Sequence, residues 1–207
     1  MAGLPTTAHA ARQRDIRQVT IAAMVGVIIL AAGTSSRYGE NKLLLPFGAG
    51  SVLSTVITTV ARSAARPIVV ITGHQAEQVQ AAVQFLTVPL QFAHNPDYRT
   101  GEMLSSVKVG LRTMMAHTPV PDAAMIVLGD QPLLRLDVIA RMLVAFEQNC
   151  GDLMTPRFGL HGQRGHPVLI GRTWWEAVLN LPPESNVREL LRSNHTRVTH
   201  LVVNNDS

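Results

Sequence analysis

The sequence predicts an α/β fold, a Rossmann-like three-layer sandwich in which helices cover both faces of a mostly parallel sheet. Several runs of strand length are apolar throughout, which is typical of strands that are buried on both faces. These runs alternate along the chain with stretches whose apolar residues recur at the helical period. The expected strands are 25–30, 67–72, 89–94, 123–128, 152–157 and 197–203.

Helices are expected between these strands. Residues 51–65 carry apolar side chains at the helical spacing, and Ser51 is a residue type that caps helix starts. A loop that leads into a strand is expected at 161–172, where the alternation breaks. We expect 1–20 to form a poorly ordered arm and 21–207 to form a single domain. The remaining helices are expected at 75–86, 103–117, 136–149 and 186–194.

The composition is that of a globular protein without the features of a nucleic-acid binder. Hydrophobic residues make up 46% and charged residues 15%, so the chain can bury a sizeable core. The formal net charge is +4, but the basic residues are scattered and aromatic residues make up only 4%. An aromatic platform for stacked bases is therefore not expected. Cys150 is the single cysteine, which excludes a disulfide framework and a cysteine-based zinc site within the chain.

The apolar run at 21–33 raises the question of membrane association or secretion. It is too short to span a bilayer. A signal peptide is the alternative, because Arg12, Arg14 and Arg17 precede the run and small residues end it. The long polar stretch before the run favours a buried strand instead. We therefore expect a cytoplasmic protein that binds neither membrane nor nucleic acid.

The loop after the first strand has the residue types of a phosphate site. Ala31, Ala32 and Gly33 are small enough for a ligand to approach the backbone, and successive N–H groups can bind an anion. Arg37 offers a planar fork of donors and Lys42 a point charge. The spacing of the glycines fits neither the P-loop nor the dinucleotide pattern. A strand-to-helix turn with two solvated charges is the alternative.

Asp130 follows the predicted strand 123–128 and supplies the second element of a site. In parallel sheets ligands bind beyond the carboxyl ends of the strands. A carboxylate there can hold Mg²⁺, which prefers one or two carboxylates together with phosphate oxygens. A turn or helix-cap role is the alternative for Asp130. The loops with Asp130 and Lys42 are expected to meet at one edge of the sheet.

Four blocks of the sequence resemble a known family. They are "LAAGTSSRYGENKLLLPFG" (30–48), "NPDYRTGEMLSSVKVGL" (95–111), "LGDQP" (128–132) and "RGHPVLI" (164–170). In the same order they resemble blocks of the nucleotidyltransferases that attach a nucleotide to molybdopterin, and the resemblance covers roughly 25–203. It implies a fold of the nucleotidyltransferase type.

Two details of the resemblance favour the molybdenum cofactor cytidylyltransferase branch. The RGHP segment, together with the helix start "SSVKVGL", is similar to that branch. The guanylyltransferase branch usually has glycine where this chain has Ala32, which favours CTP over GTP. The implied reaction joins CMP from CTP to the phosphate of molybdopterin, with Mg²⁺, and releases pyrophosphate. An apo molybdoenzyme that receives the product is a possible partner.

The resemblance also implies a role for individual residues. The nucleotide would be bound by the segment after the first strand, by two cations and by residues of three further loops. The catalytic residues would be Lys42, Arg37 and Asp130, with Arg37 on the β- and γ-phosphates, Lys42 on the α-phosphate and Asp130 on Mg²⁺. The molybdopterin would contact Gly165, His166 and Pro167. The nucleotide-binding residues would be Leu30, Ala31, Ala32, Gly33, Arg37, Lys42, Gly73, Gly101 and Ser106.

Two departures from the family pattern are visible. Tyr38 stands where the family usually has methionine. Members of the family usually continue into an acidic segment that supplies a second metal carboxylate, whereas this sequence ends at 204–207, with Asp206 outside that motif. We therefore expect a truncated C-terminal end or an incomplete metal site. The alternatives are a guanylyltransferase, a sugar- or alcohol-phosphate nucleotidyltransferase, and a module that binds nucleotide or pterin without turnover.

Overall fold

The computed structural model describes residues 23–34, 40–159 and 162–203. A central sheet has the strand order β10-β7-β9-β6-β1-β4-β5, and a short strand β8 pairs with β7. The strands are β1 (Val25–Ala31), β4 (Ile68–Thr72), β5 (Leu90–His94), β6 (Ala123–Leu128), β7 (Leu153–Phe158), β8 (Gln163–Arg164), β9 (Val168–Gly171) and β10 (Val198–Val203).

Most strand pairs in the sheet are parallel, as the alternating pattern predicts. The pairs β1–β4, β1–β6, β4–β5 and β7–β10 are parallel, whereas β9 runs antiparallel to both β6 and β7. Because β9 reverses direction between them, β6 and β7 point the same way. The carboxyl ends of six strands therefore lie at one edge of the sheet.

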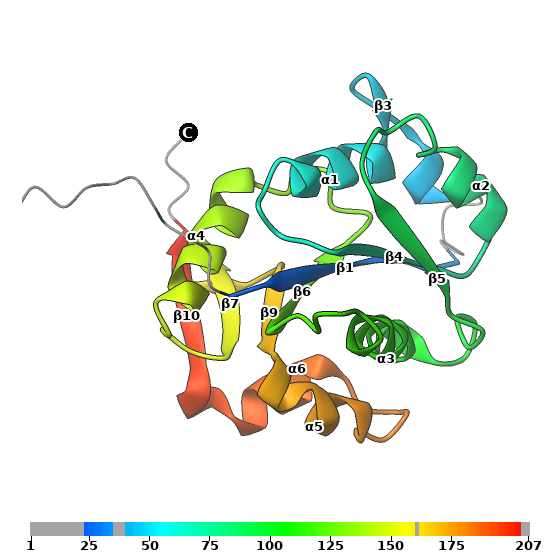
Figure 1. Ribbon diagram of the computed structural model, residues 1–207. Coiled ribbons are helices and arrows are strands. Elements are labelled where there is room, and N and C mark those ends of the chain that lie inside the picture. Colours follow the sequence, from blue (N-terminus) through cyan, green and yellow to red (C-terminus); the bar gives the residue numbers. More distant parts are fainter. Residues whose placement is uncertain (1–22, 35–39, 160–161, 204–207) are drawn as a thin grey trace, which may run out of the picture.

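Helices cover both faces of this sheet, and Figure 1 shows the three layers. One face is covered by α1 (Val52–Ala61), α2 (Ala76–Ala81) and α4 (Leu136–Glu147), whose buried side chains pack in one cluster with β1 and β6. The other face carries α3 (Glu102–Met115), α5 (Trp175–Leu179) and α6 (Val187–Ser193). The predicted three-layer α/β architecture is confirmed.

Short elements complete the fold. A two-stranded ribbon pairs β2 (Pro46–Phe47) with β3 (Gly50–Ser51), and 3-10 turns cover Lys42–Leu44, Arg172–Trp174 and His195–Arg197. In the described part of the chain, no helix has both the length and the apolarity needed to cross a bilayer.

The helix predicted at 51–65 shows where local pattern and structure agree and differ. Its start is as predicted, since the Ser54 N–H donates to Ser51 Oγ at 3.2 Å. It ends early, at Ala61, where the Arg66 guanidinium donates to the Ala61 carbonyl at 2.8 Å. That carbonyl would otherwise accept the next helical N–H, so the side chain ends the helix.

Candidate active site

Backbone hydrogen bonds join the loops that follow neighbouring strands at the carboxyl edge of the sheet. The Gly129 N–H, after β6, donates to the Leu30 carbonyl of β1 at 2.9 Å. The His74 N–H, after β4, donates to the Ala32 carbonyl at 3.2 Å. These bonds extend the ladders beyond the strands and hold the loop after β1 between its two neighbours.

Two glycines predicted to bind nucleotide differ in their surroundings. A Cβ on Gly73 would lie 2.6 Å from the Tyr98 Cβ and 2.8 Å from the Ala32 carbonyl oxygen. Gly73 is therefore required by close packing between β1, β4 and the loop after β5. Gly33 is exposed, and a Cβ there would meet no atom within 4 Å. The space beside its Cα is therefore open, and contact of its backbone with a ligand stays a prediction.

Asn95 is a site residue that the sequence analysis did not single out. Its side chain is fully buried, and its amide nitrogen donates to Ser105 Oγ at 2.8 Å and to Ser106 Oγ at 2.9 Å. Its amide oxygen accepts from the Asp97 N–H at 3.0 Å. This network fixes the start of α3 against the end of β5. The signal was its place directly after a buried strand, inside the block 95–111.

Gly101 and Ser106 lie on either side of this network. The Gly101 N–H donates to the Asp97 carbonyl at 2.7 Å, and Gly101 immediately precedes α3. Ser106 is one turn into the helix and buried, with its hydroxyl held by Asn95. Gly101 and Ser106, which with Gly73 are predicted to bind the base of the nucleotide, thus lie at the same end of α3, and their nucleotide role stays a prediction.

Lys42 opens the 3-10 turn that follows the first loop. Asn41 caps this turn, because its side-chain oxygen accepts from the Leu43 N–H at 3.1 Å. The Asn41 Nδ2 atom is buried and has no hydrogen-bond partner among the described residues. Lys42 itself is half-buried. Arg37 and Tyr38 lie outside the described residues, as does Asp206.

Asp130 is exposed, two residues beyond the carboxyl end of β6. Within residues 23–34, 40–159 and 162–203, no three His, Cys, Asp or Glu side chains are grouped closely enough to hold a metal ion. Among the described residues, Asp130 would thus be a carboxylate ligand without a cluster of others around it, and nucleotide phosphates and water could complete the site. This agrees with the usual preference of Mg²⁺ for few protein carboxylates and several other oxygens.

The structure brings His166 within electrostatic reach of Asp130. Partial burial lowers the pKa of His166, and the charge of Arg188 on α6 lowers it further, whereas the Asp130 carboxylate acts to raise it. At neutral pH the ring is therefore uncharged. Arg188 was missed by the sequence analysis, because an arginine on a short helix carries no local signal of function.

The neighbours of His166 shape the loop that presents it. A Cβ on Gly165 would lie 2.6 Å from the Phe158 ring, so only glycine lets this segment cross the ring closely. Pro167 is buried. Direct contact of Gly165 and Pro167 with a substrate stays a prediction.

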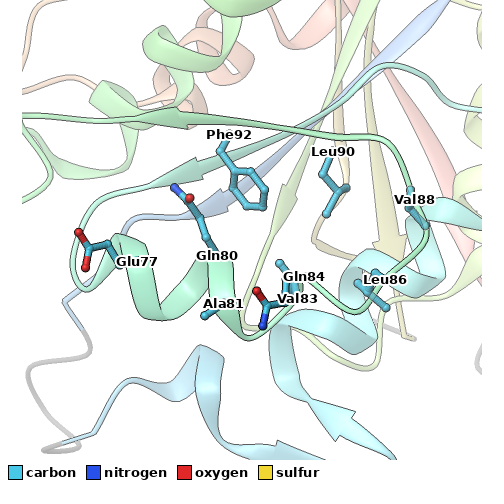
Figure 2. Close-up of a pocket in the computed structure, with 9 residues that line it drawn as sticks. All are labelled: Glu77, Gln80, Ala81, Val83, Gln84, Leu86, Val88, Leu90 and Phe92. Carbon is cyan, nitrogen blue, oxygen red and sulfur yellow. The ribbon is translucent and has the colours of Figure 1, made fainter.

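A groove of about 490 Å³ between α2 and β5 contains none of the predicted site residues. Figure 2 shows that it is lined by both apolar and polar side chains, with Phe92 and Leu90 of β5 on one side and Glu77, Gln80 and Ala81 of α2 on the other. The candidate site is instead an open edge of the sheet. Gly33 and Asp130 are exposed there, after the carboxyl ends of β1 and β6, and Asp130 acts electrostatically on His166.

Residues 27–198 match the model of the MobA-like NTP transferase domain. The chain is 28% identical to the molybdenum cofactor cytidylyltransferase of Escherichia coli (strain K12) over 175 residues, which cover 84% of each protein.

Solved structures give the same fold. Rv0371c from Mycobacterium tuberculosis H37Rv superimposes with a TM-score of 0.74 at 24% identity, covering 88% of this chain and 89% of that one. A complex of Rv0371c with manganese gives a TM-score of 0.70 at 22% identity, with the same coverage.

Proposed function

This chain belongs to the MobA-like NTP transferase family and is a nucleotidyltransferase, and from that premise we propose that it transfers CMP from CTP to the phosphate of molybdopterin. The observation that carries the proposal is that the Asp130 carboxylate acts on the pKa of His166, so the RGHP segment lies near the proposed metal ligand. We infer that the acceptor segment and the metal carboxylate belong to one site. The E. coli cytidylyltransferase, similar along 84% of both chains, supports the acceptor.

The nucleotide half of the site is proposed to lie on the loop after β1. The open backbone at Gly33 suits the ribose and triphosphate, with Arg37 on the β- and γ-phosphates and Lys42 on the α-phosphate. Ser106 and Gly101, joined through the Asn95 network, are proposed to read the base. Ala32 in place of glycine supports CTP rather than GTP.

Asp130 is proposed to hold a divalent cation, Mg²⁺, together with phosphate oxygens. An exposed carboxylate at the ligand edge fits this role, and the manganese complex of Rv0371c supports a divalent metal in this fold. A bound cation would offset the negative charge of the triphosphate. The half-buried Lys42 adds a second positive charge, which belongs to the protein and is already present before the nucleotide binds.

The proposed reaction forms one bond and breaks one bond. A phosphate oxygen of molybdopterin attacks the α-phosphorus of CTP in line, and the bond from that phosphorus to the bridging oxygen breaks, so pyrophosphate leaves. The nucleophile is already an anion, so no general base is needed. Catalysis then consists of positioning and charge neutralisation. The neutral ring of His166 can donate an N–H to the acceptor phosphate without adding a further positive charge beside the proposed metal ion.

Pyrophosphate release tests this proposal. The full chain with Mg²⁺ and molybdopterin cofactor is supplied with each of the four nucleoside triphosphates in turn. We expect release with CTP and little with GTP. Faster release with GTP would make the chain a guanylyltransferase. Release of pyrophosphate only when a sugar or alcohol phosphate is supplied would show that molybdopterin is not the acceptor. Nucleotide binding without any release would indicate a binding module.

A further inference from the structure

Two arginines oppose each other on the hairpin formed by β7 and β8. Arg157 of β7 lies directly opposite Arg164 of β8 in an antiparallel pair. Like charges in directly opposed positions destabilise a sheet. A pair of this kind is expected only where something else neutralises it. We call Arg157 and Arg164 the arginine pair.

The side chain of Arg157 is partly buried, and one of its donors has no partner among the described residues. Its Nε atom is inaccessible to solvent and has no hydrogen-bond acceptor among the described residues. Gly162, with φ of 59°, lies over this side chain, and a Cβ there would be 3.5 Å from both Cδ and Nη1 of Arg157. A buried donor without an acceptor costs free energy, so this donor favours an acceptor that a ligand supplies.

No carboxylate in the described part of the chain forms an ion pair with either arginine. The ion pairs found there join Arg135 to Asp137 and Arg172 to Asp122.

The positive charges of the arginine pair act on His200 of β10. Burial lowers the pKa of His200, and the charges of Arg157 and Arg164 lower it further. Its Nδ1 lies 3.1 Å from the hydroxyl of Thr155. The groups facing the ring from β7, β8 and β10 thus include two cations and no anion that the structure describes.

The arginine pair lies at the same edge of the sheet as the candidate active site. Between the Arg157–Arg164 pair and the Met154–Leu169 pair, β7 advances three residues while the returning chain advances five. The two extra residues form a local bulge, in the segment that contains 166–167. This segment directly follows Arg164, so the arginine pair is next to His166 along the chain.

We propose that Arg157 and Arg164 bind the phosphate monoester of the acceptor substrate and thereby orient it beside His166. This proposal rests on the proposed function for the identity of the acceptor. Two guanidinium groups offer forked donors that match the oxygens of a phosphate dianion. Such a ligand would neutralise the opposed charges and supply an acceptor for Arg157 Nε. Arg164 belongs to the RGHP segment that carries the family resemblance, but neither Arg164 nor Arg157 is among the residues to which the resemblance gives a role.

The first test needs neither nucleotide nor turnover. The ring of His200 is titrated by NMR in the full chain, with and without inorganic phosphate as the probe. We expect phosphate to raise the pKa of His200, because it offsets the two arginine charges, and we expect the Arg164→Gln variant to lose this response. A His200 titration that phosphate leaves unchanged would overturn the proposal.

The second test uses kinetics with the acceptor. In Arg157→Gln and Arg164→Gln we expect the KM for the phosphorylated acceptor to rise about tenfold or more, since charge-assisted hydrogen bonds are lost, while the KM for CTP stays unchanged. Arg192→Gln on α6, also exposed, is the matched control and should behave as wild type. Arg164 is exposed, so its variant tests the idea even where Arg157→Gln unfolds.

The two proposals can fail separately. If phosphate raises the pKa of His200 but the chain does not turn over CTP, the arginine pair is a phosphate site and the proposed reaction is contradicted. If a folded Arg164→Gln variant turns over CTP with an unchanged KM for the acceptor, the proposed reaction stands and the role of the arginine pair is contradicted.

Discussion

At the scale of single residues, Lys42 is the cation whose placement most directly concerns the reaction. It opens a 3-10 turn that Asn41 caps, so its backbone is fixed while its side chain is half-buried at the ligand edge. In its proposed role, the ammonium group of Lys42 stabilises the negative charge that develops on the α-phosphate in the transition state. The chain has only one other lysine, Lys108, whose ammonium group donates to the Leu181 carbonyl.

Replacing Lys42 is expected to slow the chemical step more than it weakens nucleotide binding. In Lys42→Ala we expect kcat to fall about 100-fold or more, because a group that stabilises transition-state charge is lost. The KM for CTP should change only a few-fold. Lys108→Ala serves as the control and should keep the wild-type kcat. An unchanged kcat with a raised KM in Lys42→Ala would contradict the role.

Gly33 and Gly73 give a second residue-scale prediction, because they differ in the space around them. In Gly33→Ala we expect wild-type stability and weakened CTP binding, since the added methyl meets only a ligand. In Gly73→Ala we expect a lower melting temperature as well, because the methyl meets Tyr98 and the Ala32 carbonyl. Thermal unfolding and calorimetric titration with CTP measure both effects. Equal stability losses in the two variants would contradict the difference.

At the scale of elements, α3 sets the distance between the sheet and the residues proposed to read the base. The helix packs closely on β1, and a Cβ on Gly110 would lie 2.5 Å from Ile28 Cγ2 and 2.9 Å from its Cδ1. A glycine within a helix usually costs stability, so its presence here indicates that close approach is needed. The same approach places Ser106 within reach of Asn95.

Gly110→Ala is expected to push α3 away from the sheet. We expect a loss of about 1–3 kcal/mol in the free energy of unfolding, as for other overpacked cores. CTP affinity should fall too, because the Asn95 network shifts. Ile28→Ala removes the atoms in conflict, so the double variant should lose less stability than the sum of the two single changes. Additive losses in urea denaturation would show that the contact is not the cause.

At the scale of the whole molecule, the sheet gathers charge at one edge. The carboxyl ends of β1, β4, β5 and β6 lead into the loops proposed to bind the nucleotide, and the reversal at β9 brings the end of β7 to the same edge. Two histidines, His166 in the segment before β9 and His200 within β10, have pKa values lowered chiefly by burial and then by nearby arginines. The folded molecule therefore resists their protonation.

This resistance predicts how stability depends on pH. As the pH falls below about 6.5, the ordinary histidine pKa, the unfolded chain takes up these protons before the folded one does. We expect the free energy of unfolding to decrease as the pH falls from 7 to about 5.5. In His200→Gln this decrease should be smaller, whereas the exposed His195→Gln should keep the wild-type slope. Urea denaturation at several pH values measures it, and equal slopes in all three proteins would contradict the assignment.

The strands could be predicted because their signal is local. The runs at 25–30 and 123–128 are apolar on both faces, and β1 and β6 match them within a residue. The loops after them follow from the rule that parallel strands end at one edge, so Gly33, Lys42 and Asp130 were expected together. The direction of β9 was not predicted, and neither were α5 and β8. The sequence of a four-residue strand is compatible with parallel and with antiparallel pairing, and the path of the chain before and after it decides between them.

The sequence by itself determined the parallel α/β fold and the loop around Gly33, because buried strands and small residues leave a pattern within a few neighbouring positions. Only the tertiary structure decided that Asn95 joins β5 to α3, that Arg188 and Asp130 act on the same histidine, and that Arg157 opposes Arg164. Each of these relations joins residues from different elements or across a turn. The register of strand pairs and the packing of helices fix such distances, and neither can be seen in the spacing of residues along the chain.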